Sequence, residues 1–139
     1  MKPIAHAAIV FGRKFADSTR LWSLALDSNM TDKQLVVTTA PNLSDARRLA
    51  HALVDRKIAA CVNIVPKIES IYRWEGKVES AEECLLLIKT TAGLFERVRS
   101  TIQELHSYQV PECIALAIEA GSLAYLKWIT DSVEDSPMP

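Results

Sequence analysis

A chain of 139 residues has room for one domain with its own hydrophobic core, and 49% hydrophobic with 24% charged residues is ordinary for a globular protein. The formal net charge of -1 gives no reason to expect a nucleic-acid partner, because a phosphate-binding surface normally carries a basic excess. Three widely spaced cysteines with apolar neighbours, Cys61, Cys84 and Cys113, favour buried thiols in the reducing cytoplasm over disulfides or a zinc site.

Residues 1–33 differ from the rest, with five basic and three acidic side chains. The apolar piece at residues 4–11 is too short to span a bilayer and has no clear cleavage site after it. We therefore expect a poorly ordered extension and no membrane partner, with an interfacial amphipathic helix as the alternative. Met30 is a candidate for the true start of the chain, and residues 34–139 form the predicted domain.

The first predicted strand covers residues 34–40 and is stopped by Pro41 and Asn42. A helix follows, because apolar residues recur at helical spacing and either Asn42 or Ser44 can cap it. The apolar positions are Ala46, Leu49, Ala50, Leu53 and Val54. His51 lies on the polar flank of this helix, where we expect it to be exposed to solvent.

A long β-hairpin is predicted over residues 58–91, with its turn at Glu75-Gly76. Gly76 supplies the positive φ that a two-residue turn needs. Strands are typically about 5–6 residues long, so such arms should overhang the sheet or bend, and Pro66 is the expected break because it cannot donate to a ladder. Overhanging arms with exposed apolar side chains indicate that another chain covers them.

Three further elements are predicted after the hairpin. A second helix places Leu94, Val98, Ile102 and Leu105 on one face, an apolar strand covers residues 113–118, and a last helix opens at Gly121-Ser122. The order β-α-β-β-α-β plus α predicts an α+β fold of ferredoxin-like type, with both main helices on one face of a four-stranded antiparallel sheet. The other face then needs a cover, and we expect a homo-oligomer to supply it.

The segment from His106 to Glu112 gathers polar and aromatic groups in a loop, where sites are commonly built. His106 is a candidate metal ligand with Glu112 as a second donor, or else a helix C-terminal histidine that interacts with the helix dipole. Lys89 is expected to pair with Glu112 or to bind an anion. The acidic cluster Glu79, Glu82 and Glu83 reads as a solubilising strand edge.

Sequence signatures of enzymes and of structural metal sites are absent. The four glycines are isolated, so no phosphate-binding loop exists, and no G-x-S-x-G elbow occurs. No His-x-x-x-His or Cys-x-x-Cys spacing is present. We therefore predict that the chain is not an enzyme and requires no cofactor.

Several short motifs occur together in a fixed order. They are Thr39-Ala40-Pro41, Ala59-Ala60-Cys61-Val62-Asn63-Ile64, Ser70-Ile71-Tyr72-Arg73-Trp74-Glu75-Gly76-Lys77, Ile88-Lys89-Thr90, His106-Ser107-Tyr108-Gln109-Val110-Pro111-Glu112 and Tyr125-Leu126-Lys127-Trp128. In this order they resemble the CutA family of divalent-cation tolerance proteins. The resemblance implies a ferredoxin-like fold assembled as a homotrimer, an architecture related to the PII signalling proteins, and a part in copper and divalent-cation tolerance without a known reaction.

The resemblance also implies three copper-ligand positions, which this chain only partly keeps. The family's cysteine position is Thr38 here, and its two adjacent histidines are Leu105 and His106. Neither a hydroxyl nor Leu can replace a soft thiolate or a second imidazole. We therefore expect Cu(II) or another divalent cation to bind weakly, with His106 as the best remaining ligand.

A second hypothesis also follows from the PII-like assembly. The protein would be a trimeric regulatory or scaffold protein whose inter-subunit clefts hold a small anionic ligand near Trp74, Lys89, Tyr108 and Glu112. An enzyme on the same scaffold is the weakest hypothesis, because a fold alone specifies no chemistry.

Overall fold

The computed structural model describes residues 31–134. All of its helices and strands belong to the compact unit that begins at Asp32. The predictions for the extension at residues 1–33 and for Met30 fall almost entirely outside the described residues. Only the end of the predicted extension is described, and there Lys33 already belongs to the first strand.

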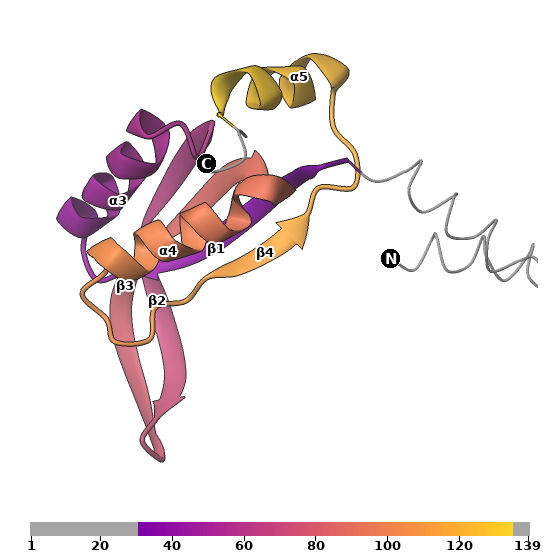
Figure 1. The fold of residues 1–139 in the computed structure, drawn as a ribbon. Helices are drawn as coiled ribbons and strands as arrows, with labels where there is room; N and C mark the ends of the chain where they lie inside the picture. Colours follow the sequence, from indigo (N-terminus) through magenta and orange to yellow (C-terminus); the bar gives the residue numbers. More distant parts are fainter. Residues whose placement is uncertain (1–30, 135–139) are drawn as a thin grey trace, which may run out of the picture. The chain divides into compact units, whose positions relative to one another are not determined.

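The four strands form one antiparallel sheet in the order β2-β3-β1-β4 (Figure 1). The strands are β1 (Lys33–Ala40), β2 (Cys61–Trp74), β3 (Lys77–Thr91) and β4 (Ile114–Ala117). The last strand is two residues shorter than the predicted 113–118, because its pairing with β1 runs only from Ile114 to Ala117. The predicted α+β class is confirmed, and the elements follow one another in the predicted order.

Two of the three described α-helices start at a residue whose side chain caps the first turn. α3 (Leu43–Asp55) is capped by Asn42, whose side-chain oxygen accepts from the Asp45 N–H at 2.8 Å. α4 (Phe95–Leu105) begins one residue later than predicted, because the 3₁₀ turn η1 (Ala92–Leu94) precedes it. α5 (Leu123–Ser132) is capped by Ser122. None of the described helices is long and apolar enough to cross a membrane.

The hydrophobic core lies between one face of the sheet and the helices α3 and α4 (Figure 1). Alternate residues of the two central strands point into it, so that β1 and β3 each contribute every second side chain. The largest fully buried apolar side chains of this core are Leu49, Leu53, Ile58, Leu86, Ile88, Leu94 and Ile102. This packing places both main helices on the same face, as the sequence predicts.

The long hairpin is confirmed in its turn and its break. Glu75 and Gly76 have φ values of 48° and 80°, and Trp74 pairs with Lys77 across them. The β2–β3 register shifts between Val65 and Ile68, where Pro66 interrupts the ladder. The hairpin end projects beyond β1, because β1 pairs with β3 only as far as Cys84 (Figure 1).

The opposite face of the sheet is apolar and only partly covered in the single chain. Leu35 and Val37 of β1 are half-buried and lie opposite Leu116 and Ile114 of β4, which remain 50% and 54% exposed. Leu87 of β3 continues the same face beside Val37. We call these residues, with Leu85 and Val65, the open face. α5 covers only one end of it, where the Lys89 ammonium lies 5.8 Å from the Tyr125 ring centroid.

Candidate functional site

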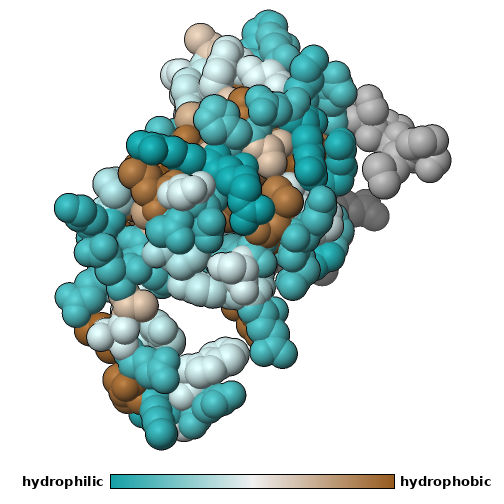
Figure 2. Space-filling model, turned by 90° about the vertical axis from the view of Figure 1, so that its left-hand side faces the viewer, coloured by the Kyte–Doolittle hydropathy of each residue, from teal (hydrophilic) through white to brown (hydrophobic). Residues whose placement is uncertain are grey.

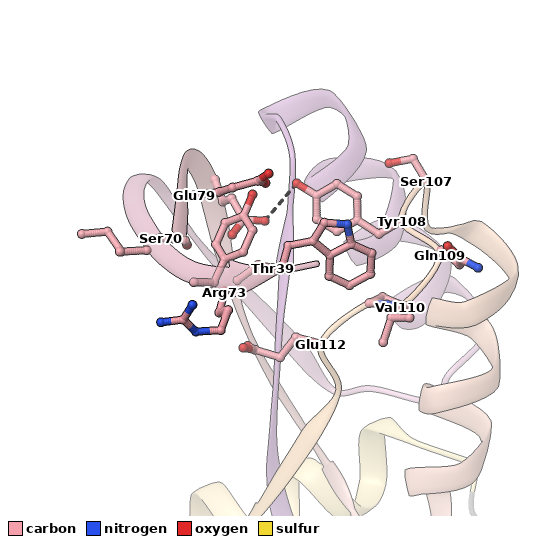
Figure 3. A pocket seen from close by; sticks show the side chains of 14 residues that line it. Thr39, Ser70, Arg73, Glu79, Ser107, Tyr108, Gln109, Val110 and Glu112 are labelled. Carbon is pink, nitrogen blue, oxygen red and sulfur yellow. Dashed lines mark hydrogen bonds between the residues drawn. The ribbon is translucent and has the colours of Figure 1, made fainter. Parts of the chain in front are cut away.

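The described residues form a pocket of about 830 Å³ between the projecting hairpin and the loop that leads into β4 (Figures 2 and 3). The hairpin contributes residues 70–74, Glu79 and Glu83, the loop contributes residues 107–112, and β1 contributes Thr39. Since Thr39 shares its side of β1 with Val37, the pocket continues the open face at its hairpin end. Small-molecule sites typically have volumes of about 300–1,000 Å³, so the pocket is large enough for an organic ligand.

A buried carboxylate lies in the pocket wall. Glu83 is 7% exposed, and its Oε2 accepts a hydrogen bond from the Tyr108 hydroxyl at 3.0 Å (Figure 3). Burial, this hydrogen bond and the nearby negative charge of Glu83 raise the pKa of Tyr108 to about 12. The reading of Glu83 as part of a solubilising edge is therefore wrong, although Glu79 and Glu82 are exposed.

The charges of the pocket are mainly negative. Glu79, Glu83 and Glu112 line it together with one basic residue, Arg73. The Arg73 guanidinium donates to the Gly76 carbonyl at 3.3 Å and points away from Tyr108 (Figure 3). Within residues 31–134, none of the three carboxylates forms an ion pair.

His106 fastens the loop to β1 through both of its ring nitrogens. Nε2–H donates to the Thr39 carbonyl at 2.6 Å, and Nδ1 accepts from the Tyr108 N–H at 3.0 Å. These two bonds fix one neutral tautomer, because Nδ1 must be unprotonated to accept. A metal ion can bind this imidazole only after one of the two bonds breaks. His106 is the C-cap residue of α4, but its ring bonds to β1 and not to the carbonyl groups of its own helix.

The other two positions that the resemblance marks as ligands are also occupied by structural contacts. Thr38 is fully buried, and its hydroxyl donates to the Glu112 carbonyl at 2.6 Å. Leu105 packs against the core, and its carbonyl accepts from Arg48 at 2.7 Å. No group of three or more His, Cys, Asp or Glu side chains in the described part of the chain is arranged to hold a metal ion.

The four predicted cleft residues do not all meet within one chain. Trp74, Tyr108 and Glu112 line the pocket, but Lys89 lies outside it and donates to Asn63 Oδ1 at 2.5 Å. The expected pairing of Lys89 with Glu112 is therefore wrong within a single chain. A contribution of Lys89 to a cleft between subunits stays a prediction.

The three cysteines and His51 are the remaining side chains that the sequence singles out. All three cysteines are free, and Cys84 is buried whereas Cys61 and Cys113 are half-buried. Burial raises the pKa of the Cys113 thiol, which disfavours the reactive thiolate. His51 is exposed on α3, as predicted.

Comparison with known proteins places the chain in a family. The family model for CutA1 divalent ion tolerance proteins matches residues 34–132. The chain is 47% identical over 102 residues to the chloroplastic Protein CutA 1 of Oryza sativa, covering 73% of this chain and 58% of that protein. It is 45% identical over 100 residues to the divalent-cation tolerance protein CutA of Thermus thermophilus, covering 72% and 97%.

Solved structures agree with this assignment. The Thermus thermophilus divalent cation tolerance protein superposes with a TM-score of 0.72 at 44% identity, covering 73% of this chain and 99% of that one. The rice CutA1 crystal structure superposes with a TM-score of 0.74 at 44% identity, covering 78% and 99%. The fold and the matched segment thus define an α+β protein of the divalent-ion-tolerance class. The chain belongs to the CutA1 family.

Some of the relatives are longer than the segment they share with this chain, and their names give different compartments. The chain spans 58% and 60% of the length of the rice and Arabidopsis thaliana proteins that it matches. These two proteins are named chloroplastic, and the Archaeoglobus fulgidus structure is described as periplasmic.

Proposed function

We propose that this protein acts in divalent-cation tolerance as a non-catalytic, cytoplasmic homotrimer. The match of residues 34–132 to the CutA1 family carries the proposal. The isolated glycines and the lack of a G-x-S-x-G elbow in the sequence support a role without a chemical reaction. Fractionation of native cells tests the compartment, and recovery of the protein in an organelle or the periplasm would contradict that part.

The fold supports the trimer through its open face. The strand order β2-β3-β1-β4 with two crossover helices is that of ferredoxin-like folds, and the helices leave one apolar face to be covered. Burying apolar surface yields roughly 25 cal/mol per Å², so contact between such faces is a driving force for association. Light scattering coupled to size-exclusion chromatography tests this, since a monomer at micromolar concentration would contradict the proposal.

We expect Cu(II) to bind weakly, with His106 as the ligand in this domain. The hydrogen bonds on both ring nitrogens support weak binding, because a metal must displace either the Thr39 carbonyl or the Tyr108 amide to reach the imidazole. Thr38 and Leu105 offer no soft or imidazole donor in place of the missing ligands. The affinity should therefore lie below that of a site with three ligating side chains.

A Cu(II) titration followed by electron paramagnetic resonance tests this role. The full chain contains His6, His51 and His106, so His106→Ala is compared with His51→Ala and His6→Ala. We expect His106→Ala to lower the Cu(II) affinity of this domain about tenfold or more. His51→Ala and His6→Ala should leave the Cu(II) affinity of this domain unchanged. Equal, tight binding by wild type and His106→Ala would contradict the assignment.

The PII-like regulatory or scaffold role remains the second candidate. The pocket at the hairpin end of the open face favours it, because Trp74, Tyr108 and Glu112 already line a cavity of ligand size. A thermal-shift screen of metals against nucleotides, organic acids and amines separates the two roles. Stabilisation by Cu(II) alone would count against a ligand-binding role.

A further inference from the structure

The pocket between the hairpin and the loop combines aromatic walls with negative charge. Tyr72, Trp74 and Tyr108 line it and keep 40%, 44% and 37% of their surfaces exposed in the single chain. Three aromatic side chains therefore line one cavity, where a ligand can contact their rings. Ring faces attract cations through the negative charge of the π system.

The buried carboxylate strengthens the preference for a cation. Buried charges in proteins are almost always paired, because desolvation of an isolated ion is costly. Glu83 has only the neutral Tyr108 hydroxyl as a hydrogen-bond partner among the described residues, and a carboxylate offers about four acceptor positions. The pocket wall therefore contains a largely buried carboxyl group that has no ion-pair partner among the described residues.

The remaining charges point in the same direction. Glu112 and Glu79 add two carboxylates, whereas the Arg73 guanidinium is engaged by the turn carbonyl of Gly76. An anion would meet net repulsion here, contrary to the anionic ligand expected from the sequence. A bare metal ion is also a poor match, because the described acidic side chains are not grouped closely enough to chelate one.

We propose that this pocket binds a small organic ammonium ion, held by the Glu83 carboxylate and the ring faces of Tyr72, Trp74 and Tyr108. The inference goes beyond divalent-cation tolerance and does not depend on His106 or on copper. The pocket lies at the end of the open face, so a second copy of the chain can border it. Insertion of a basic side chain from that copy is the competing outcome of the test.

Isothermal titration calorimetry of the full chain with choline as the probe tests the proposal. The neutral carbon isostere of choline, in which a carbon replaces the cationic nitrogen, has the same shape without the charge. Acetate serves as the anionic probe. We expect choline to bind at least about tenfold more tightly than its isostere, and acetate not to bind.

Substitutions of glutamates inside and outside the pocket test whether choline binds there. Glu83→Gln keeps an acceptor for Tyr108 but removes the buried charge, and it should weaken choline binding about tenfold or more. Glu82→Gln is the matched control, because it removes the same charge from the adjacent exposed residue outside the pocket lining. Its affinity should stay within about twofold of wild type. If Glu83→Gln fails to fold, the exposed Glu112→Gln substitution replaces it, with a loss of about threefold or more.

Several results would overturn the proposal. These are no choline binding by wild type, equal binding of the neutral isostere, preference for acetate, or unchanged choline affinity in both pocket variants. A fall in subunit number in Glu83→Gln without any choline binding by wild type would show instead that a basic side chain of a second copy fills the pocket. The copper titration tests His106, whereas the choline titration tests the pocket around Glu83. Either proposal can therefore fail without the other.

Discussion

His106→Ala should destabilise the protein, because the imidazole joins the loop before β4 to the end of β1. The substitution removes the bond from Nε2 to the Thr39 carbonyl at 2.6 Å and the bond from the Tyr108 N–H to Nδ1 at 3.0 Å. A protein hydrogen bond contributes about 0.5–1.5 kcal/mol net, so the two together contribute about 1–3 kcal/mol. The Tyr108 amide is on an exposed residue and can bond to water, which places the expected loss near 2 kcal/mol.

Guanidinium unfolding at one fixed protein concentration measures this loss, since the stability of an oligomer depends on concentration. His51→Ala is the matched control, because His51 is exposed on α3 and alanine is the better helix former. His106→Asn should recover about half of the loss, since its side-chain oxygen can accept from the Tyr108 N–H in place of Nδ1. If His106→Ala loses no more stability than His51→Ala, the imidazole does not fasten the loop.

Two further predictions concern the open face and the pocket. Leu116→Lys places a charge on the open face and should abolish the trimer. Val54→Lys is the control and should keep the trimer, because Val54 lies on α3 and is already 40% exposed. Light scattering that shows an unchanged trimer for Leu116→Lys would refute the role of this face. The raised pKa of Tyr108 means that the folded chain holds the phenol proton more tightly than the unfolded chain, so its contribution is complete below pH 10.0 and is lost as pH rises to about 12. Denaturation midpoints should therefore fall more steeply with alkaline pH for wild type than for Tyr108→Phe, and parallel curves would contradict the assigned pKa.

The hairpin and the order of the elements along the chain were predictable because their signals are local. Gly76 marks the turn, Pro66 marks the break, and the apolar patterns separate helices from strands. The bounds of β4 differ from the prediction by one residue at each end because pairing with the distant β1 decides them. The start of α4 differs by one residue because a 3₁₀ turn precedes the helix.

The site was less predictable, because it depends on side chains that are distant in the sequence. Glu83 looks like its exposed neighbour Glu82, and only its place two residues before Leu85 on the open face could have separated the two. Its bond to Tyr108 spans 25 positions. Lys89 was assigned to the cleft from a shared family motif, but the register places it opposite Leu35 and Cys61, away from the pocket.

We expect the apolar sheet face and the projecting hairpin to make this CutA1-family chain assemble with copies of itself. Native mass spectrometry of protein purified from its own host tests it most directly, because subunit number and any retained metal or metabolite are read together. The account predicts three subunits. A monomer would contradict it.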